Sequence, residues 1–127
     1  MKIGTDITVV SRIENSINRF DNKFLDKFLT KEEQQQLSKK PESIAGYWSA
    51  KEAISKALGC GIGAELSFHD IILYKDDKKA PHFKLTPKAQ AIHKIKSSSL
   101  SIAHDGGFAI AVVVIDDHNI KSTPFFS

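Results

Sequence analysis

Two carboxylates and one lysine have the surroundings and spacing of a divalent-cation and phosphate site. Asp6 lies among apolar and small residues of a strand-like pattern, where burying an ion is costly unless a cation or hydrogen bonds compensate it. Glu52 and Lys56 are four positions apart in a helical pattern. A carboxylate on a strand and another on a helix could hold Mg²⁺ against phosphate oxygens, with the lysine meeting further phosphate charge. Two simpler interpretations stay open: a solvent-facing Asp6 on an edge strand, and a surface ion pair of Glu52 with Lys56.

A glycine-rich segment and one histidine are weaker candidates. The segment with Gly59 and Gly61 follows a helical pattern and does not end in the Lys-Ser/Thr pair of a phosphate-binding P-loop. It is therefore typical of a helix end followed by a turn. His104 stands beside Asp105 at a predicted strand end, where it could contact phosphate or be an ordinary surface residue. Cys60 is the only cysteine, which excludes an intrachain disulfide and a cysteine-rich zinc site.

The elements that must position these residues are predicted from periodicity and capping signals. Alternation over residues 2–10 predicts a strand with Ile3, Ile7 and Val9 on its covered face and Asp6 on the other. Short helices follow, with Ser11 as a possible N-cap and Phe20, Phe24 and Phe28 at core spacing. Thr30 and Glu33 form a capping box for a helix ending near Pro41, and a long helix covers residues 42–58.

The second half of the chain predicts mainly strands. Residues 68–74 and 82–85 suggest a hairpin, and a helix runs from Pro87 to about Lys96. Residues 99–104 and 108–115 are expected to pair across Asp105-Gly106-Gly107. We expect the tail, residues 121–127, to be frayed or docked on a neighbouring chain. The fold class is therefore α+β, a small antiparallel sheet packed with one long and several short helices.

Composition sets the broad class of protein. The 127 residues (14.1 kDa) are 41% hydrophobic and 26% charged, which predicts a single folded domain spanning residues 1–127. No apolar run approaches the roughly 20 residues that cross a bilayer, and Asp6 stands where a signal peptide needs its apolar core, so we expect a soluble, cytoplasmic protein without a membrane partner. The net charge of +3 permits an acidic partner, but the aromatic and basic footprint of nucleic-acid binding is not evident.

Several motifs together resemble the holo-acyl-carrier-protein synthases, the small trimeric branch of the 4′-phosphopantetheinyl transferase superfamily. Residues 51–62 read Lys-Glu-Ala-Ile-Ser-Lys-Ala-Leu-Gly-Cys-Gly-Ile, which follows the family signature Lys-Glu-Ala-x-x-Lys-Ala-x-Gly-x-Gly-Ile. The start Ile3-Gly4-Thr5-Asp6-Ile7 with Arg12-Ile13, and the segments at residues 28–33, 68–71 and 100–111, complete the family order. The resemblance covers nearly the whole chain.

The resemblance implies transfer of 4′-phosphopantetheine from coenzyme A to a serine of apo-acyl carrier protein, releasing adenosine 3′,5′-bisphosphate, in support of fatty acid biosynthesis. Asp6 and Glu52 match the family's Mg²⁺ ligands, and Lys56 matches its active-site lysine. Lys56, Gly59, Gly61 and His104 would contact coenzyme A. Either Glu52 or a metal-bound water could accept the proton of the serine.

The resemblance also implies a homotrimer with sites at subunit interfaces, so that His104 would reach coenzyme A bound by an adjacent subunit. Arg12 matches a position that docks the acidic helix of the carrier protein, and Arg19 extends the basic character nearby. The chain departs from the family at Tyr47, where an arginine is common, and at Cys60 and Ala103, where hydroxyl residues are common. A non-catalytic coenzyme A- or carrier-binding module of the same fold is the alternative, although such a module needs no metal-holding carboxylate pair.

Overall fold

The elements of the computed structural model, which describes residues 1–118, follow the predicted order with shifts at their ends. The strands are β1 (Lys2–Val9), β2 (Ile71–Lys75), β3 (Pro81–Leu85), β4 (Ile95–Asp105) and β5 (Phe108–Asp117). The helices are α1 (Val10–Phe20), α2 (Asn22–Phe28), α3 (Lys31–Gln36), α4 (Pro41–Ala57) and α5 (Pro87–His93), with a 3-10 turn at Phe68–Asp70. The predicted α+β class is confirmed, whereas the tail considered above lies outside the described residues.

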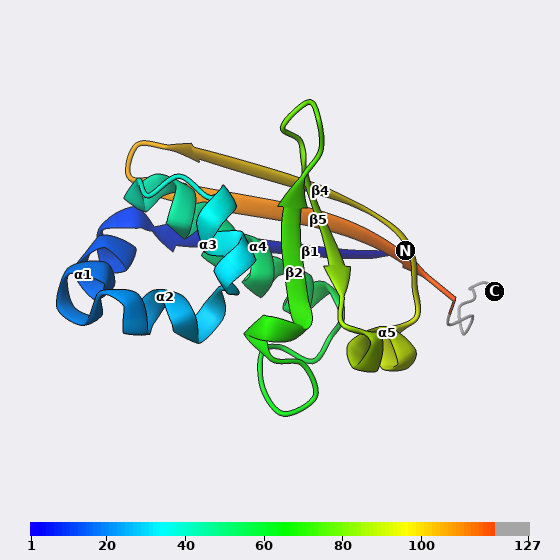
Figure 1. The fold of residues 1–127 in the computed structure, drawn as a ribbon. Helices are drawn as coiled ribbons and strands as arrows, with labels where there is room; N and C mark the ends of the chain where they lie inside the picture. Colours follow the sequence, from blue (N-terminus) through cyan, green and yellow to red (C-terminus); the bar gives the residue numbers. More distant parts are fainter. Residues whose placement is uncertain (119–127) are drawn as a thin grey trace.

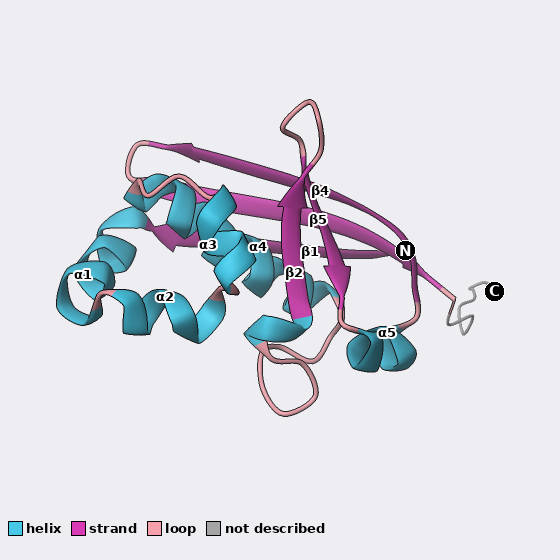
Figure 2. Ribbon diagram, in the orientation of Figure 1, coloured by secondary structure: helices cyan, strands magenta, loops and turns pink. Residues whose placement is uncertain are grey.

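Within residues 1–118, two antiparallel sheets make up the β structure (Figure 2). The larger has the order β1-β5-β4, and the smaller is the β2-β3 hairpin, which crosses in front of the long strands in Figure 1. The predicted turn between β4 and β5 is confirmed: Gly106 and Gly107 have φ values of 57° and 85°, as a two-residue turn of the primed type requires. None of the helices within residues 1–118 is long and apolar enough to cross a membrane.

The covered face of β1 is the opposite of the predicted one. The alternation is confirmed, but Gly4 and Thr8, on the side of Asp6, are the buried residues, and they pack against α4. Ile3 and Ile7 are 63% and 60% exposed. The prediction was wrong because it assigned the large apolar side chains to the core, whereas α4 approaches β1 so closely that only small side chains fit between them.

Glycine at position 4 makes this close approach possible. A Cβ atom at Gly4 would lie 2.0 Å from the carbonyl oxygen of Ala53 and 2.9 Å from the Cβ atom of Ala57. Gly46 has a similar role nearer the N-terminal end of α4, where a Cβ atom would lie 2.8 Å from Cγ2 of Ile102 on β4. The backbone of α4 therefore rests almost directly on the sheet, and the position of β1 relative to α4 is fixed by backbone contact.

The N-terminal helices differ from the prediction in two details. Ser11 does not cap α1, which begins at Val10; the N–H of Val10 donates to the carbonyl of Gly107 at 2.9 Å, so the β4-β5 turn takes over the role of a cap. Phe20 is not a core residue, because it is half exposed beneath the Arg19 guanidinium, 5.3 Å from the ring centroid. The capping box of Thr30 and Glu33 is confirmed.

A buried ion pair ties α4 to the elements on its other side. Nζ of Lys51 lies 2.9 Å from Oε1 of Glu33, with the two side chains 0% and 1% exposed. The ammonium also donates to the carbonyls of Phe28 and Phe68, at 2.7 and 3.0 Å, and Oε2 of Glu33 accepts the N–H of Leu73. Burial lowers the pKa of Lys51, and the charge of Glu33 opposes that effect. With its hydrogen bonds satisfied, the pair joins α2, α3, α4 and β2.

We expect Gly4→Ala to lower the free energy of unfolding by at least about 3 kcal/mol, because the new methyl group must displace helix backbone. Urea denaturation measures this difference. Gly63→Ala is the matched control: a Cβ atom there meets nothing within 4 Å and φ is unexceptional, so we expect a change within about 0.5 kcal/mol. Equal stability of the two variants would contradict the packing argument.

We expect Lys51→Met to destabilise the fold by about 3–5 kcal/mol, because it leaves the carboxylate of Glu33 buried without its cation. Lys31→Met removes the lysine of an exposed pair with Asp26, whose atoms are 3.1 Å apart, and serves as the control. That change is expected to cost less than about 1 kcal/mol. Thermal and urea unfolding of both variants would reveal the difference, and a Lys51→Met protein as stable as Lys31→Met would show that the pair is dispensable.

Candidate active site

The site is built where β1 passes the C-terminal half of α4. Oδ1 of Asp6 on β1 lies 2.8 Å from Nζ of Lys56 on α4, and the same ammonium reaches the carbonyl of Thr5 at 3.3 Å. The Asp6 side chain is 14% exposed, so its charge is largely withdrawn from water. Asp6 is therefore not the fully solvated carboxylate of the simpler interpretation, and Lys56 pairs with Asp6 while its charge also acts on Glu52.

Two hydroxyl groups orient the Asp6 carboxylate. The hydroxyl of Thr8 donates to Oδ2 of Asp6 at 3.1 Å, and it also bonds to the hydroxyl of Ser49 on α4. Either hydroxyl can be the donor in this bond, and the hydroxyl of Ser49 also lies 3.4 Å from the carbonyl oxygen of Ala109. Sequence reasoning missed both residues. Thr8 was recognisable as the neighbour of Asp6 on the same strand face, but only the fold brings Ser49, 41 positions away, into contact.

Glu52 completes the group from the next turn of α4. Burial raises the pKa of Glu52, the nearby charge of Asp6 raises it further, and Lys56 lowers it. Two carboxylates thus share one partly buried region with Lys56, which is bonded to Asp6 and whose charge also acts on Glu52. Such a pair is stabilised by any additional cation. Their hard oxygen donors, on a strand and a helix held in backbone contact, fit a Mg²⁺ ion that keeps several waters.

Asp6 and Glu52 face an open cleft of about 330 Å³ between β1, α1 and α4. Arg12 and Ser16 line it from α1, and Phe24 and Trp48 form an aromatic wall, with ring centroids 5.8 Å apart. The cleft therefore presents two carboxylates, one guanidinium and an aromatic surface. This arrangement suits a substrate with both charged phosphate groups and apolar portions.

Five predicted site residues do not line this cleft: Lys56, which is bonded to Asp6, and Arg19, Gly59, Gly61 and His104. Gly59 and Gly61, just beyond α4, have φ values of 82° and 66°, so glycine is required there by backbone conformation. His104 lines a separate cavity of about 200 Å³ with Tyr47, Lys75 and Lys79. Tyr47 is a buried residue whose hydroxyl has no hydrogen-bond partner within residues 1–118. A single chain thus assembles Asp6, Glu52, Lys56 and Arg12 but not His104.

Comparison with known proteins decides the family. A family model described as the 4′-phosphopantetheinyl transferase superfamily matches residues 2–113. The chain belongs to this superfamily. The holo-[acyl-carrier-protein] synthases of Sulfurovum sp. (strain NBC37-1) and Campylobacter lari are 55% and 57% identical to it over 116 and 114 residues, which cover 91% and 90% of this chain and 97% of each relative. The resemblance drawn from the motifs is confirmed.

A solved structure of the same superfamily shows the same arrangement of elements. The crystal structure of Helicobacter pylori holo-[acyl-carrier-protein] synthase in complex with coenzyme A has a TM-score of 0.87 and 49% sequence identity to this chain. The match covers 90% of this chain and 99% of the other. The elements β1 and α4 are therefore part of a fold that, in the Helicobacter pylori protein, was crystallised with coenzyme A.

The titration of Glu52 tests this geometry directly. We expect Asp6→Asn to lower the pKa of Glu52, because it removes a like charge and releases Lys56, and Lys56→Gln to raise it. Carboxyl ¹³C NMR of the metal-free protein across the acid range measures both shifts. Cation binding should weaken as pH falls through this raised pKa, since the protonated carboxyl is a poor ligand. Shifts in the same direction in both variants would contradict the assigned neighbours.

Proposed function

We propose that this chain transfers the 4′-phosphopantetheine group of coenzyme A to a serine hydroxyl of an apo-acyl carrier protein, in support of fatty acid biosynthesis in the cytoplasm. The observation that carries the proposal is the grouping of Asp6, Glu52 and Lys56 beside one cleft, in a chain whose relatives are holo-[acyl-carrier-protein] synthases. The serine oxygen forms a bond to the β-phosphorus, the bond from that phosphorus to the bridging oxygen breaks, and adenosine 3′,5′-bisphosphate leaves.

Each residue of the group has a part in this step. Asp6 and Glu52 would hold Mg²⁺, which neutralises pyrophosphate charge when bound. Thr8 and Ser49 keep the Asp6 carboxylate in one orientation. Lys56, one turn beyond Glu52 and bonded to Asp6, would meet the charge that develops on the leaving phosphate. Either the carboxylate of Glu52 or a metal-bound water would accept the proton of the serine.

The binding of coenzyme A is proposed to involve two subunits. Lys56, Gly59 and Gly61 would contact it from the chain that supplies the carboxylates. His104 would contact its phosphates from an adjacent chain, and the lysines lining the His104 cavity, Lys75 and Lys79, support this role because they add positive charge. Tyr47 takes the place of an arginine in that cavity. The phosphates bound there would therefore be contacted by Lys75, Lys79 and His104.

The carrier protein is proposed to dock along α1. Arg12 lines the cleft, and Arg19 lies seven positions later, on the same face of the helix. A neighbouring hollow lined by Phe20, Lys23 and Lys27 continues this basic surface, sharing Ser16 and Phe24 with the cleft. An acidic helix lying on this surface would bring its serine toward Glu52, and salt would slow the encounter.

A homotrimer is supported by the uncovered face of the larger sheet. Ile3 and Ile7 on β1 and Phe108, Ile110 and Val112 on β5 are all exposed, side by side in the antiparallel register. Continuous apolar surface of this kind marks protein interfaces. An assembly of copies through this face also explains how β1 retains large apolar side chains on the side away from α4.

Intact-mass spectrometry of an apo-acyl carrier protein incubated with this protein, coenzyme A and Mg²⁺ tests the function. We expect a gain of one phosphopantetheine group, absent with EDTA, and rates reduced at least about 100-fold in Asp6→Asn and Glu52→Gln. Glu32→Gln, on exposed α3 surface, is the control and should retain the wild-type rate. No mass gain with several carrier proteins, while coenzyme A still binds, would favour the non-catalytic module.

The trimer is tested separately by analytical ultracentrifugation. We expect three chains in the wild-type assembly, and dissociation when Ile7→Lys places like charges within the apolar face. Ile92→Lys changes an exposed isoleucine on α5, away from that face, and should leave the assembly intact. A monomeric wild-type protein would overturn the proposed assembly.

A further inference from the structure

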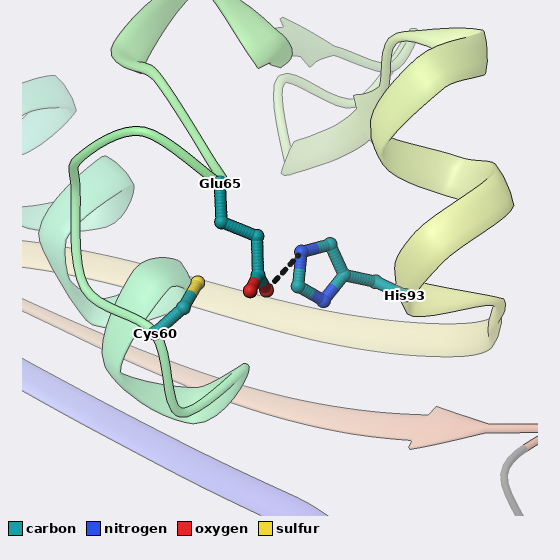
Figure 3. A group of neighbouring side chains, drawn as sticks. All are labelled: Cys60, Glu65 and His93. Atoms are coloured by element: carbon teal, nitrogen blue, oxygen red, sulfur yellow. Dashed lines mark ion pairs between the residues drawn. The ribbon is translucent and has the colours of Figure 1, made fainter.

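Three side chains with metal-ligating atoms converge beyond the C-terminal end of α4. Cys60 and Glu65 belong to the loop after α4, and His93 is the last residue of α5 (Figure 3). Their ligand atoms all lie within 4.8 Å of one another, and Nε2 of His93 lies 3.3 Å from Oε2 of Glu65. In Figure 3 the thiol, the carboxylate and the imidazole point toward one another from these two segments.

The backbone holds these residues in place. The loop is closed at its start by the N–H of Gly61 donating to the carbonyl of Ser55, at 3.2 Å, and at its end by the N–H of Gly63 donating to the carbonyl of Leu66, at 2.9 Å. Leu66 is fully buried and anchors the segment. His93 is 6% exposed, whereas Cys60 is partly and Glu65 largely exposed. The group is therefore buried at His93 and accessible to solvent at Glu65.

We propose that Cys60, Glu65 and His93 form a binding site for a zinc ion, separate from the carboxylate pair of the cleft. Tetrahedral zinc holds nitrogen and oxygen ligands about 3.4 Å apart, which matches the His93–Glu65 separation. One thiolate, one carboxylate and one neutral imidazole sum to two negative charges, which Zn²⁺ cancels. Three protein ligands leave the fourth position for water on the open side of the group.

The mixed ligand set also separates this site from a Mg²⁺ site. Thiolate and imidazole are poor ligands for Mg²⁺ and good ones for zinc, whereas the two carboxylates of the cleft have the opposite preference. The two sites share no residue. Because a thiol binds zinc as the thiolate, zinc binding to a protonated Cys60 releases a proton.

The prediction is one zinc ion per chain that millimolar Mg²⁺ does not displace. Untagged, reduced protein is titrated with Zn²⁺ against a fluorescent chelator in excess Mg²⁺, which occupies the carboxylate pair. We expect Cys60→Ser to weaken zinc binding at least about 100-fold and Glu65→Gln to weaken it about 10-fold. Glu65 is exposed, so its replacement leaves the fold intact and keeps the test independent of stability.

Two further measurements make the assignment specific. With Co²⁺ in place of zinc, we expect a thiolate-to-metal charge-transfer band that Cys60→Ser abolishes. Zinc at ten times its Kd should raise the Tm by about 5 °C in the wild type and not in Cys60→Ser. The control is His82→Gln, which removes another histidine-carboxylate pair, 2.8 Å from Asp76. Equal zinc affinity in Cys60→Ser and the wild type, or loss of binding in His82→Gln, would overturn the proposal.

Discussion

The backbone contact between β1 and α4 at Gly4 is the constraint on which the site depends. Without a side chain at that position, the strand lies against the carbonyl of Ala53, and Asp6, two residues later, comes within hydrogen-bonding distance of Lys56. A long flexible linkage could not hold two carboxylates close enough for one to perturb the pKa of the other. Rigid packing of backbone on backbone does so, and it leaves the charged ends free for chemistry.

The opposite side of α4 is fixed by charge. Lys51, buried and bonded to Glu33 and two carbonyls, faces away from the sheet, while Glu52, the next residue, faces the cleft. One helix thus carries a fully buried, paired ion and an ion that lines a cleft in adjacent positions. The charge of Lys51 is matched by Glu33 and two carbonyls, whereas the pKa of Glu52 is raised by burial and by the nearby charge of Asp6.

The sequence predicted the positions of the helices and strands better than it predicted which face of each is buried. Helix α4, the Thr30 capping box and the two-glycine turn carry local signals, and each is confirmed. The covered face of β1 was predicted wrongly, because alternation shows that two faces differ without showing which one a small-residue helix covers. Asp6, Glu52 and Lys56 were recognisable as a set, but the Thr8–Ser49 support and the Glu33–Lys51 pair depend on contacts across 41 and 18 positions. Periodicity carries no information about such contacts.

The pairing of β1 with β5 has a consequence for synthesis of the protein. Residue by residue, Lys2–Val9 pairs with Phe108–Ile115, so the strand that carries Asp6 has no sheet partner until nearly all of the described chain has emerged from the ribosome. Contacts this distant in sequence form slowly, whereas α4 and the β4-β5 hairpin can form locally. During translation the N-terminal strand therefore remains without a sheet partner. We expect the site that includes Asp6 to reach its final geometry only after β5 has been synthesised.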